Sequence, residues 1–138
     1  MRRAPTGRVD LMMDVNQPAV HAEVTAAFAR YEAALTTNDV AVLDELFWND
    51  ALVIRYGVTE VLHGASEIAA FRAARPSVGL MRSITRTVIT TFGQDFATAS
   101  TLFHRVTVPG KLGRQMQTWV RMPEGWRVVA AHVSLVDE

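Results

Sequence analysis

Cysteine is absent from this sequence of 138 residues, which excludes disulfides, thiolate catalysis and zinc–sulfur sites. The chain also lacks the glycine-rich, nucleophile-elbow and HExxH motifs of nucleotide-binding proteins, serine hydrolases and zinc peptidases. Its four histidines are scattered without the spacing of metal ligands; they are His21, His63, His104 and His132. We therefore expect any activity to need neither a metal nor another cofactor.

Lysine is almost absent as well, since Lys111 is the one lysine among fourteen basic residues. The other basic residues are arginines, and fourteen acidic residues balance the total to a formal net charge of zero. A nucleic-acid-binding protein normally carries a strongly basic face, so nucleic acid is not an expected partner. Arginine presents a rigid planar fork that matches carboxylates, although GC-rich codon usage would also enrich it.

Long apolar runs are missing too. No run approaches the length of a membrane-spanning helix, and residues 1–13 lack the apolar segment of a secretory signal. We interpret residues 1–13 as a flexible extension and residues 14–138 as a single domain, because this length gives room for one core. Together with the absence of cysteine, this predicts a cytoplasmic protein with no membrane partner.

The first part of the chain has helical periodicity. A helix is predicted over residues 17–36, with Pro18 in its first turn, where a missing N–H costs nothing. A shorter helix containing Leu43 and Leu46 follows, and a third runs from residue 65 to about residue 75, where Pro76 ends it. The apolar stripe of the first helix consists of Val20, Val24, Phe28, Tyr31 and Leu35.

The second part of the chain has the period of strands. Residues 51–54 are predicted as a short buried strand, and alternation from residue 81 onward predicts four more. These cover residues 83–92, 96–108, 112–122 and 126–136. Helices followed by a strand meander predict an α+β domain, with N-terminal helices packed on a curved antiparallel sheet.

Such a sheet can wrap the first helix and leave a cone-shaped, ligand-sized cavity. In the last strand, the predicted faces are both largely apolar. One face consists of Val129, Ala131, Val133 and Leu135, and the other of Val128, Ala130, His132 and Ser134. Because only one face can pack on the helices, we expect a homodimer through the outer face of the sheet.

Tyr31 and Arg55 are the candidate catalytic residues. Tyr31 is either a core aromatic or a phenol that is aimed into the cavity and can donate a proton. Arg55 ends an apolar strand, so it needs either an acidic side chain or a substrate carboxylate as a partner. The acidic residues considered are Glu32, Asp44 and Glu60. The residues alone leave these alternatives open.

Five further residues are candidate substrate-binding residues. Arg72 and Arg75 lie on the third helix with no acidic residue three or four positions away. Gln117 shares a strand face with other polar and aromatic residues, and His132 and Ser134 share a face of the last strand. The alternative for each is structural: a solvated arginine, an amide near a subunit boundary or a hydrogen-bonded core histidine.

Long stretches of the chain carry a resemblance to a known family. They are AEVTAAFARYEAALTTNDVAVLDELFW (22–48), IRYGVTE (54–60), EIAAFRAARP (67–76), VITTFGQDFATAS (88–100) and QTWVRMPEGWRVVAAHVSL (117–135). These stretches resemble the AtzH-like proteins, also called oxalurate-catabolism proteins, of the SnoaL-like superfamily. The match spans nearly the whole chain after the extension.

The resemblance implies a ketosteroid-isomerase-like fold, usually dimeric, and a role in bacterial nitrogen catabolism beside amidase-family hydrolases. The implied activity is the conversion of 1,3-dicarboxyurea to allophanate in cyanuric acid breakdown, a decarboxylating amide hydrolysis. The family's catalytic tyrosine and the arginine of its RYG motif correspond to Tyr31 and Arg55. We therefore predict that Tyr31 donates a proton and that Arg55 anchors a carboxylate or carbonyl of a small anionic, urea-like substrate.

Two other classes of function remain open. Another SnoaL-like enzyme, an isomerase or cyclase, would need a carboxylate base and an apolar pocket. A non-catalytic binding or assembly module is the second, because the ending WRVVAAHVS also resembles the association domains of calmodulin-dependent kinases.

Overall fold

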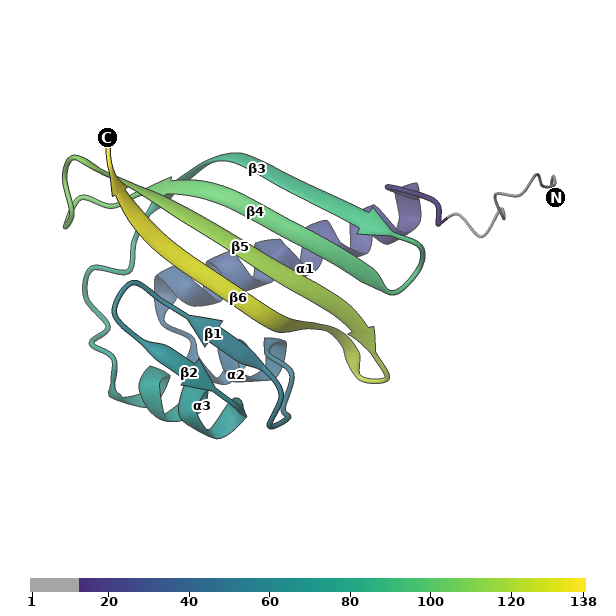
Figure 1. Ribbon diagram of the computed structural model, residues 1–138, viewed down its shortest axis with the longest axis horizontal. Coiled ribbons are helices and arrows are strands. Elements are labelled where there is room, and N and C mark those ends of the chain that lie inside the picture. Colours follow the sequence, from purple (N-terminus) through teal and green to yellow (C-terminus); the bar gives the residue numbers. More distant parts are fainter. Residues whose placement is uncertain (1–12) are drawn as a thin grey trace, which may run out of the picture.

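The computed structural model describes residues 13–138, so the predicted extension over residues 1–13 falls outside it apart from Met13. Three helices precede most of one six-stranded sheet, which confirms the α+β class (Figure 1). The helices are α1 (Pro18–Thr37), α2 (Val40–Leu46) and α3 (Ala65–Ala74). The strands are β1 (Ile54–Tyr56), β2 (Val61–His63), β3 (Ser83–Phe92), β4 (Phe96–His104), β5 (Lys111–Met122) and β6 (Gly125–Asp137).

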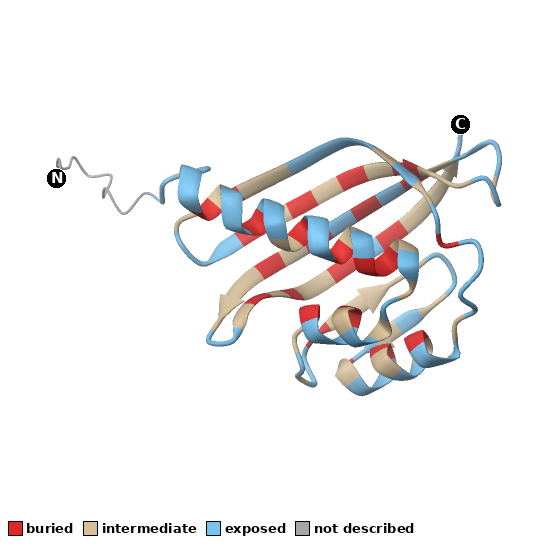
Figure 2. Cartoon of the chain, turned by 180° about the vertical axis from the view of Figure 1, so that it is seen from behind, coloured by how far each residue is buried: buried red, intermediate tan, exposed pale blue. Residues whose placement is uncertain are grey.

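The sheet has the order β2-β1-β6-β5-β4-β3. Strands β3 to β6 form the predicted antiparallel meander, while β1 pairs parallel to β6 and antiparallel to β2. The parallel pair departs from the expected all-antiparallel sheet. It arises because the chain leaves α2 at Phe47, which bridges to Val128 of β6 in the same parallel sense. Helix α1 crosses the inner face of the curved meander, and α2 and α3 lie at the side of β1 and β2 (Figures 1 and 2).

Helix α1 has defined signals at both ends. The Gln17 side chain accepts a hydrogen bond from the Val20 N–H, and Pro18 occupies the first turn. At the other end Asn38 adopts a left-handed conformation with φ of 55°, and its N–H donates to carbonyls of the last turn. The buried stripe between these ends is the predicted one, and it places Tyr31 against the sheet and α2.

Four local features differ from the prediction. Residues 51–53 form a turn rather than a strand, because the Asp50 carboxylate accepts the Leu52 N–H and turns the chain; strand β2 was not predicted at all. Strand β4 ends at His104 and not at 108, since a turn closes with Val108 N–H donating to the Arg105 carbonyl.

The fourth difference concerns the faces of β6. The register of β5 and β6 shifts between Thr118 and Trp119, which is the mark of a β-bulge. Val128 therefore lies on the inner face with Ala131 and Val133 and is 0% exposed. The alternation predicted for Val128 and Val129 is reversed, because a bulge changes the parity of the strand.

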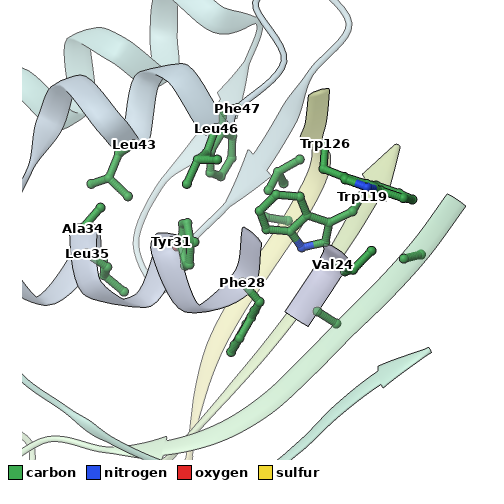
Figure 3. Packing of buried hydrophobic residues seen from close by; sticks show 14 of the residues in the cluster. Val24, Phe28, Tyr31, Ala34, Leu35, Leu43, Leu46, Phe47, Trp119 and Trp126 are labelled. Atoms are coloured by element: carbon green, nitrogen blue, oxygen red, sulfur yellow. The ribbon is translucent and has the colours of Figure 1, made fainter. Parts of the chain in front are cut away.

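The core lies between α1 and the meander and extends to α2, and its most closely packed aromatic residue lies under the first turns of α1. Trp119 of β5 is fully buried there, among the side chains of Val24 and Phe28 (Figure 3). Its indole N–H donates to the Gln117 side chain at 3.0 Å, so the one polar atom of the ring is paired. None of the helices in residues 13–138 is both long and apolar enough to cross a membrane.

Candidate active site

A cavity of about 170 Å³ lies under the last turns of α1. It brings Tyr31 and Arg55 together, as we expected from the helix stripe and the strand end. The lining residues come from α1, β1, α3, the meander and the connecting loops. They are Tyr31, Leu35, Arg55, Val58, Glu60, Phe71, Arg75, Leu80, Arg82, Arg105, Gln115 and Val133.

Tyr31 is held by aromatic packing. Its ring centroid is 6.5 Å from that of Phe28 and 6.2 Å from that of Phe47, and the residue is 3% exposed. An ionised Tyr31 would raise the pKa of Arg72, Arg75 and Arg105. Arg75 and Arg105 line the same cavity as Tyr31, so a ligand bound there can contact all three side chains.

Arg55 projects from β1 beside Glu60. Its Nη1 lies 3.5 Å from a carboxylate oxygen of Glu60, and this nitrogen is buried without a hydrogen-bond partner. The chain turns between the two residues, with the Gly57 N–H donating to the Glu60 carbonyl. A Cβ at Gly57 would come within 1.9 Å of the Glu60 carboxylate, so glycine is needed here for the carboxylate to reach Arg55.

Arg75 and Arg105 have no ion-pair partner among residues 13–138, although their side chains are partly buried. Burial, followed by the charge of Arg55, lowers the pKa of Arg75. Burial, followed by the charge of Arg82, lowers the pKa of Arg105. Nε and Nη2 of Arg75 and Nε of Arg105 are buried donors without an acceptor. Such groups cost free energy until a ligand binds them.

Arg82 is paired, in contrast. Its Nε and Nη2 donate to the two carboxylate oxygens of Glu32 at 2.9 and 2.7 Å, and Nη2 also donates to Gln115 Oε1 at 3.0 Å. The Arg82 side chain is 1% exposed, so this bidentate pair is nearly dry. Glu32 thus pairs directly with Arg82, and its charge also raises the pKa of the nearby Arg105, against the larger lowering effect of burial.

The charges around the cavity do not balance. Four arginines, Arg55, Arg75, Arg82 and Arg105, face two carboxylates, those of Glu60 and Glu32. Two positive charges are therefore in excess, in a space where water screens them weakly. A small dianion is the ligand that would neutralise this cavity.

Most of the other predicted binding residues lie outside the cavity. Arg72 is buried between α2 and α3, where it donates to Asp44 at 3.0 Å and stacks over the Phe47 ring at 4.3 Å. It lines a larger hollow of about 520 Å³ that contains neither Tyr31 nor Arg55. Gln117 is on the inner face but is engaged by Trp119.

His132 and Ser134 lie on the outer face of the sheet, contrary to the expected position in the cavity wall. The His132 ring packs edge-on against Tyr56 at 6.1 Å, and Ser134 Oγ accepts from Arg114 Nε at 3.1 Å. The inner positions of β6 are occupied by Ala131 and Val133 because side chains alternate along the strand. Of the five candidate binding residues, Arg75 lines the cavity.

Gln115 was considered together with Gln117 as a residue that could line a polar cavity, and it does line this one, but two charged cavity residues were missed, Arg82 and Arg105. A signal for Arg105 exists, because Ala97, Ala99 and Phe103 are inner residues of β4 and Arg105 continues their parity. Arg82 likewise stands two residues before Ile84, which packs against the core. A period-two pattern that runs from apolar residues into an arginine is the pattern to search for.

The cavity residues offer no metal site of an ordinary kind, since they include one carboxylate and no histidine. No cluster of three or more histidine, aspartate or glutamate side chains suited to a metal ion occurs in residues 13–138. Metal independence of the activity stays a prediction.

Comparisons with solved structures place this fold among the NTF2-like and ketosteroid-isomerase-like proteins. An NTF2-like protein of unknown function from Pseudomonas putida is 16% identical, with a TM-score of 0.70 over 84% of this chain and 86% of that one. The profile of the AtzH-like family matches residues 13–138, and the chain belongs to that family.

Two solved structures are much more similar in sequence. A protein of unknown function from the DUF3225 family of Pectobacterium atrosepticum is 66% identical, with a TM-score of 0.88 over 90% of this chain and 96% of that one. A cystatin-like fold protein from Burkholderia xenovorans is 51% identical, with a TM-score of 0.87 over 91% of this chain and 98% of that one. No curated protein matches the sequence.

Proposed function

We propose that this protein is a decarboxylating amidohydrolase that converts 1,3-dicarboxyurea to allophanate in the breakdown of cyanuric acid and related nitrogen compounds. The observation that carries the proposal is the excess of two positive charges in a cavity of about 170 Å³. The substrate is a small planar dianion, and membership of the AtzH-like family supports the same activity.

In the proposed step Tyr31 is the proton donor. The bond between one carboxylate carbon and its nitrogen breaks, and the electron pair stays on the nitrogen. The nitrogen takes the proton of the Tyr31 hydroxyl, so that carbon dioxide and allophanate are the products. Arg75 and Arg105 are close enough to stabilise the negative charge left on the phenolate, which then recovers a proton from water.

Arg55 is the proposed anchor for the carboxylate that is retained, or for the urea carbonyl. A guanidinium can hold either group through two parallel N–H donors. It should not hold the departing carboxylate, because an interaction equally strong before and during the reaction does not raise turnover. Glu60 occupies the neighbourhood of Arg55 in the free protein and would move aside as the substrate binds.

The cavity argues against the isomerase or cyclase alternative. Glu60 is the one carboxylate in its lining, and that carboxylate faces Arg55 rather than an apolar space. A general base for proton abstraction from a neutral ligand would need a less electropositive surrounding.

The test is an assay of the purified protein with dicarboxyurea, following carbon dioxide and allophanate. Tyr31→Phe keeps the ring and should lower turnover by about 10²–10⁴-fold, more than it weakens binding. Arg55→Lys keeps the positive charge but loses the planar, bidentate guanidinium, so it should also lower turnover. Activity should survive EDTA and dialysis. Variants that keep a normal circular dichroism spectrum and full turnover would overturn the assignment of both residues.

We also propose a homodimer formed through the outer face of the sheet. An apolar hollow there involves Ile54, Tyr56, Met116, Ala130 and His132, and Met116 is 62% exposed. In many homodimers an exposed apolar face of this kind is buried against the same face of the second subunit. Light scattering at micromolar concentration tests this, and a monomer alone would contradict it.

A further inference from the structure

We propose that Arg105 and Gln115 form a second anion-binding subsite, across the cavity from Arg55, so that the protein selects small dicarboxylates over monocarboxylates. This inference deepens the proposed function and rests on it for the identity of the natural ligand. The recognition itself is a property of the cavity and can be measured without turnover.

The first argument is that the cavity arginines form two separate groups. Arg55 and Arg75 lie over the Phe71 ring, at 5.4 and 5.9 Å from its centroid. Arg82 and Arg105 lie over the Phe103 ring, at 4.6 and 4.9 Å. Strands β6 and β5 separate β1 from β4, so the backbones that carry Arg55 and Arg105 are about 14 Å apart, which is three interstrand spacings.

The second argument is the fixed direction of the Gln115 amide. Arg82 carries only donors, so the Gln115 atom that accepts from Arg82 Nη2 must be its oxygen. The amide nitrogen is then turned the other way. It is buried, in a residue 1% exposed, and has no hydrogen-bond partner. A buried N–H donor held in one orientation, in the wall of a cavity, is suited to an oxygen of a ligand.

The third argument is that Arg105 is the available charge on this side. The neighbouring Arg82 is already neutralised by its bidentate contact with Glu32. Arg105 pairs with no carboxylate of residues 13–138, and its buried Nε lacks an acceptor. The Arg82–Glu32 pair thus acts as a support that orients Gln115, and Arg105 supplies the positive charge.

The arrangement has a consequence for the reaction. A dianion can fill both subsites, one carboxylate at Arg55 and Arg75 and the other at Arg105 and Gln115. After one carboxylate has left as carbon dioxide, allophanate can fill only one of them. The second subsite would therefore favour binding of the substrate over retention of the product.

The experiment measures binding of unreactive probes by calorimetry at constant ionic strength. Malonate and succinate are compared with acetate and propionate, for the wild type, Arg105→Gln, Gln115→Met and the control Arg30→Gln. Arg30 is a surface residue paired with Glu45, away from the cavity, so its variant removes the same charge. All variants are first checked for folding by circular dichroism.

We expect the wild type to bind the preferred dicarboxylate about tenfold more tightly than its monocarboxylate, or better, as a charged hydrogen bond would provide. Arg105→Gln and Gln115→Met should each reduce this ratio while monocarboxylate binding persists, and Arg30→Gln should not. A wild-type ratio near one, or a ratio unchanged in folded Arg105→Gln, overturns the inference. If the ratio behaves as expected but dicarboxyurea is not turned over, the proposed function fails and the subsite stands. If dicarboxyurea is turned over normally but the wild type does not prefer dicarboxylates, the second subsite fails and the proposed function stands.

Discussion

The two ends of the space between α1 and the sheet have opposite characters. Under the first turns of α1 the large side chains are mostly apolar and closely packed, as with Val24, Phe28 and Trp119, none of which is more than 5% exposed. Under the last turns, Tyr31 of α1 and Gln115 of β5 face a cavity together with four arginines that come from β1, the end of α3 and the chain next to β3 and β4. The two ends therefore differ both in the elements that line them and in the chemistry of the side chains there.

The comparison shows that the residues that stabilise the fold and the residues suited to binding a ligand lie at different ends of this space. At the packed end, burial removes apolar area from water and leaves few polar atoms unpaired, which is favourable. At the cavity end, burial lowers the pKa of Arg75 and of Arg105, so the folded protein holds these charges at a cost. That cost is recovered when an anion binds. Substitutions at the two ends should therefore have opposite effects on stability.

The largest effect is expected at the packed end. Trp119→Ala should lower the free energy of unfolding by about 3–5 kcal/mol, because it opens a cavity in the core and leaves the Gln117 amide without its partner. Urea denaturation measures this loss. Binding of a dicarboxylate by the molecules that remain folded should change little. If affinity fell in parallel with stability, the two ends would not be independent.

The next effect is expected where the two ends meet in one ion pair. Glu32→Gln should lower the free energy of unfolding by about 2–3 kcal/mol, since it leaves the nearly dry Arg82 guanidinium without a counter-charge. The control is Glu45→Gln, which breaks the exposed pair with Arg30, where both side chains are nearly half exposed. A loss no larger in Glu32→Gln than in this control would show that the buried pair is not a structural support.

A gain in stability is expected at the cavity end. Arg75→Met keeps much of the side-chain length but removes a desolvated charge that has no acidic partner in residues 13–138. The free energy of unfolding should rise by about 1 kcal/mol, while affinity for a small anion falls. Denaturant melts with and without malonate measure both quantities. A destabilised Arg75→Met variant would contradict the view that this end stores unfavourable charge.

The packed end is also the part of the molecule that the sequence predicts best. The stripe from Val20 to Leu35 and the meander follow from periodicity, because apolar residues there repeat with the period of their element. Periodicity fails at the β5–β6 bulge, where one extra residue reverses the faces and carries Val128 inward.

The candidate site was predicted only in part, for a different reason. Tyr31 and Arg55 each stand next to apolar residues in a regular pattern, so local reasoning can find them. The pair between Glu32 and Arg82 joins residues 50 positions apart, and no local pattern predicts such a contact. Arg105 continues the inner parity of β4, but its role depends on which neighbours have already been neutralised, which only the folded chain reveals.

The smallest effect sharpens the comparison, because it concerns charges at the rim of the packed end. Glu23 accepts hydrogen bonds from the Trp126 indole N–H at 2.9 Å and from Arg121 Nη1 at 2.6 Å. The bond from Trp126, opposed by partial burial and assisted by Arg121, lowers the pKa of Glu23 below its ordinary value of 4.5. Unlike Arg75 and Arg105, Glu23 has an oppositely charged partner, and its Oε1 accepts both of these hydrogen bonds.

A carboxylate whose pKa is lower in the folded state stabilises the protein above its unfolded pKa, and this contribution disappears as the pH falls through the folded value. Glu23 is 46% exposed in its side chain, so water screens the pair and the contribution should be about 0.2–1 kcal/mol. Glu23→Gln should therefore destabilise the protein slightly at pH 7 and hardly at all near pH 3. Urea melts of both proteins at the two pH values measure the difference. An equal loss at both values would mean that the hydrogen bond from Trp126, rather than the charge, accounts for the effect.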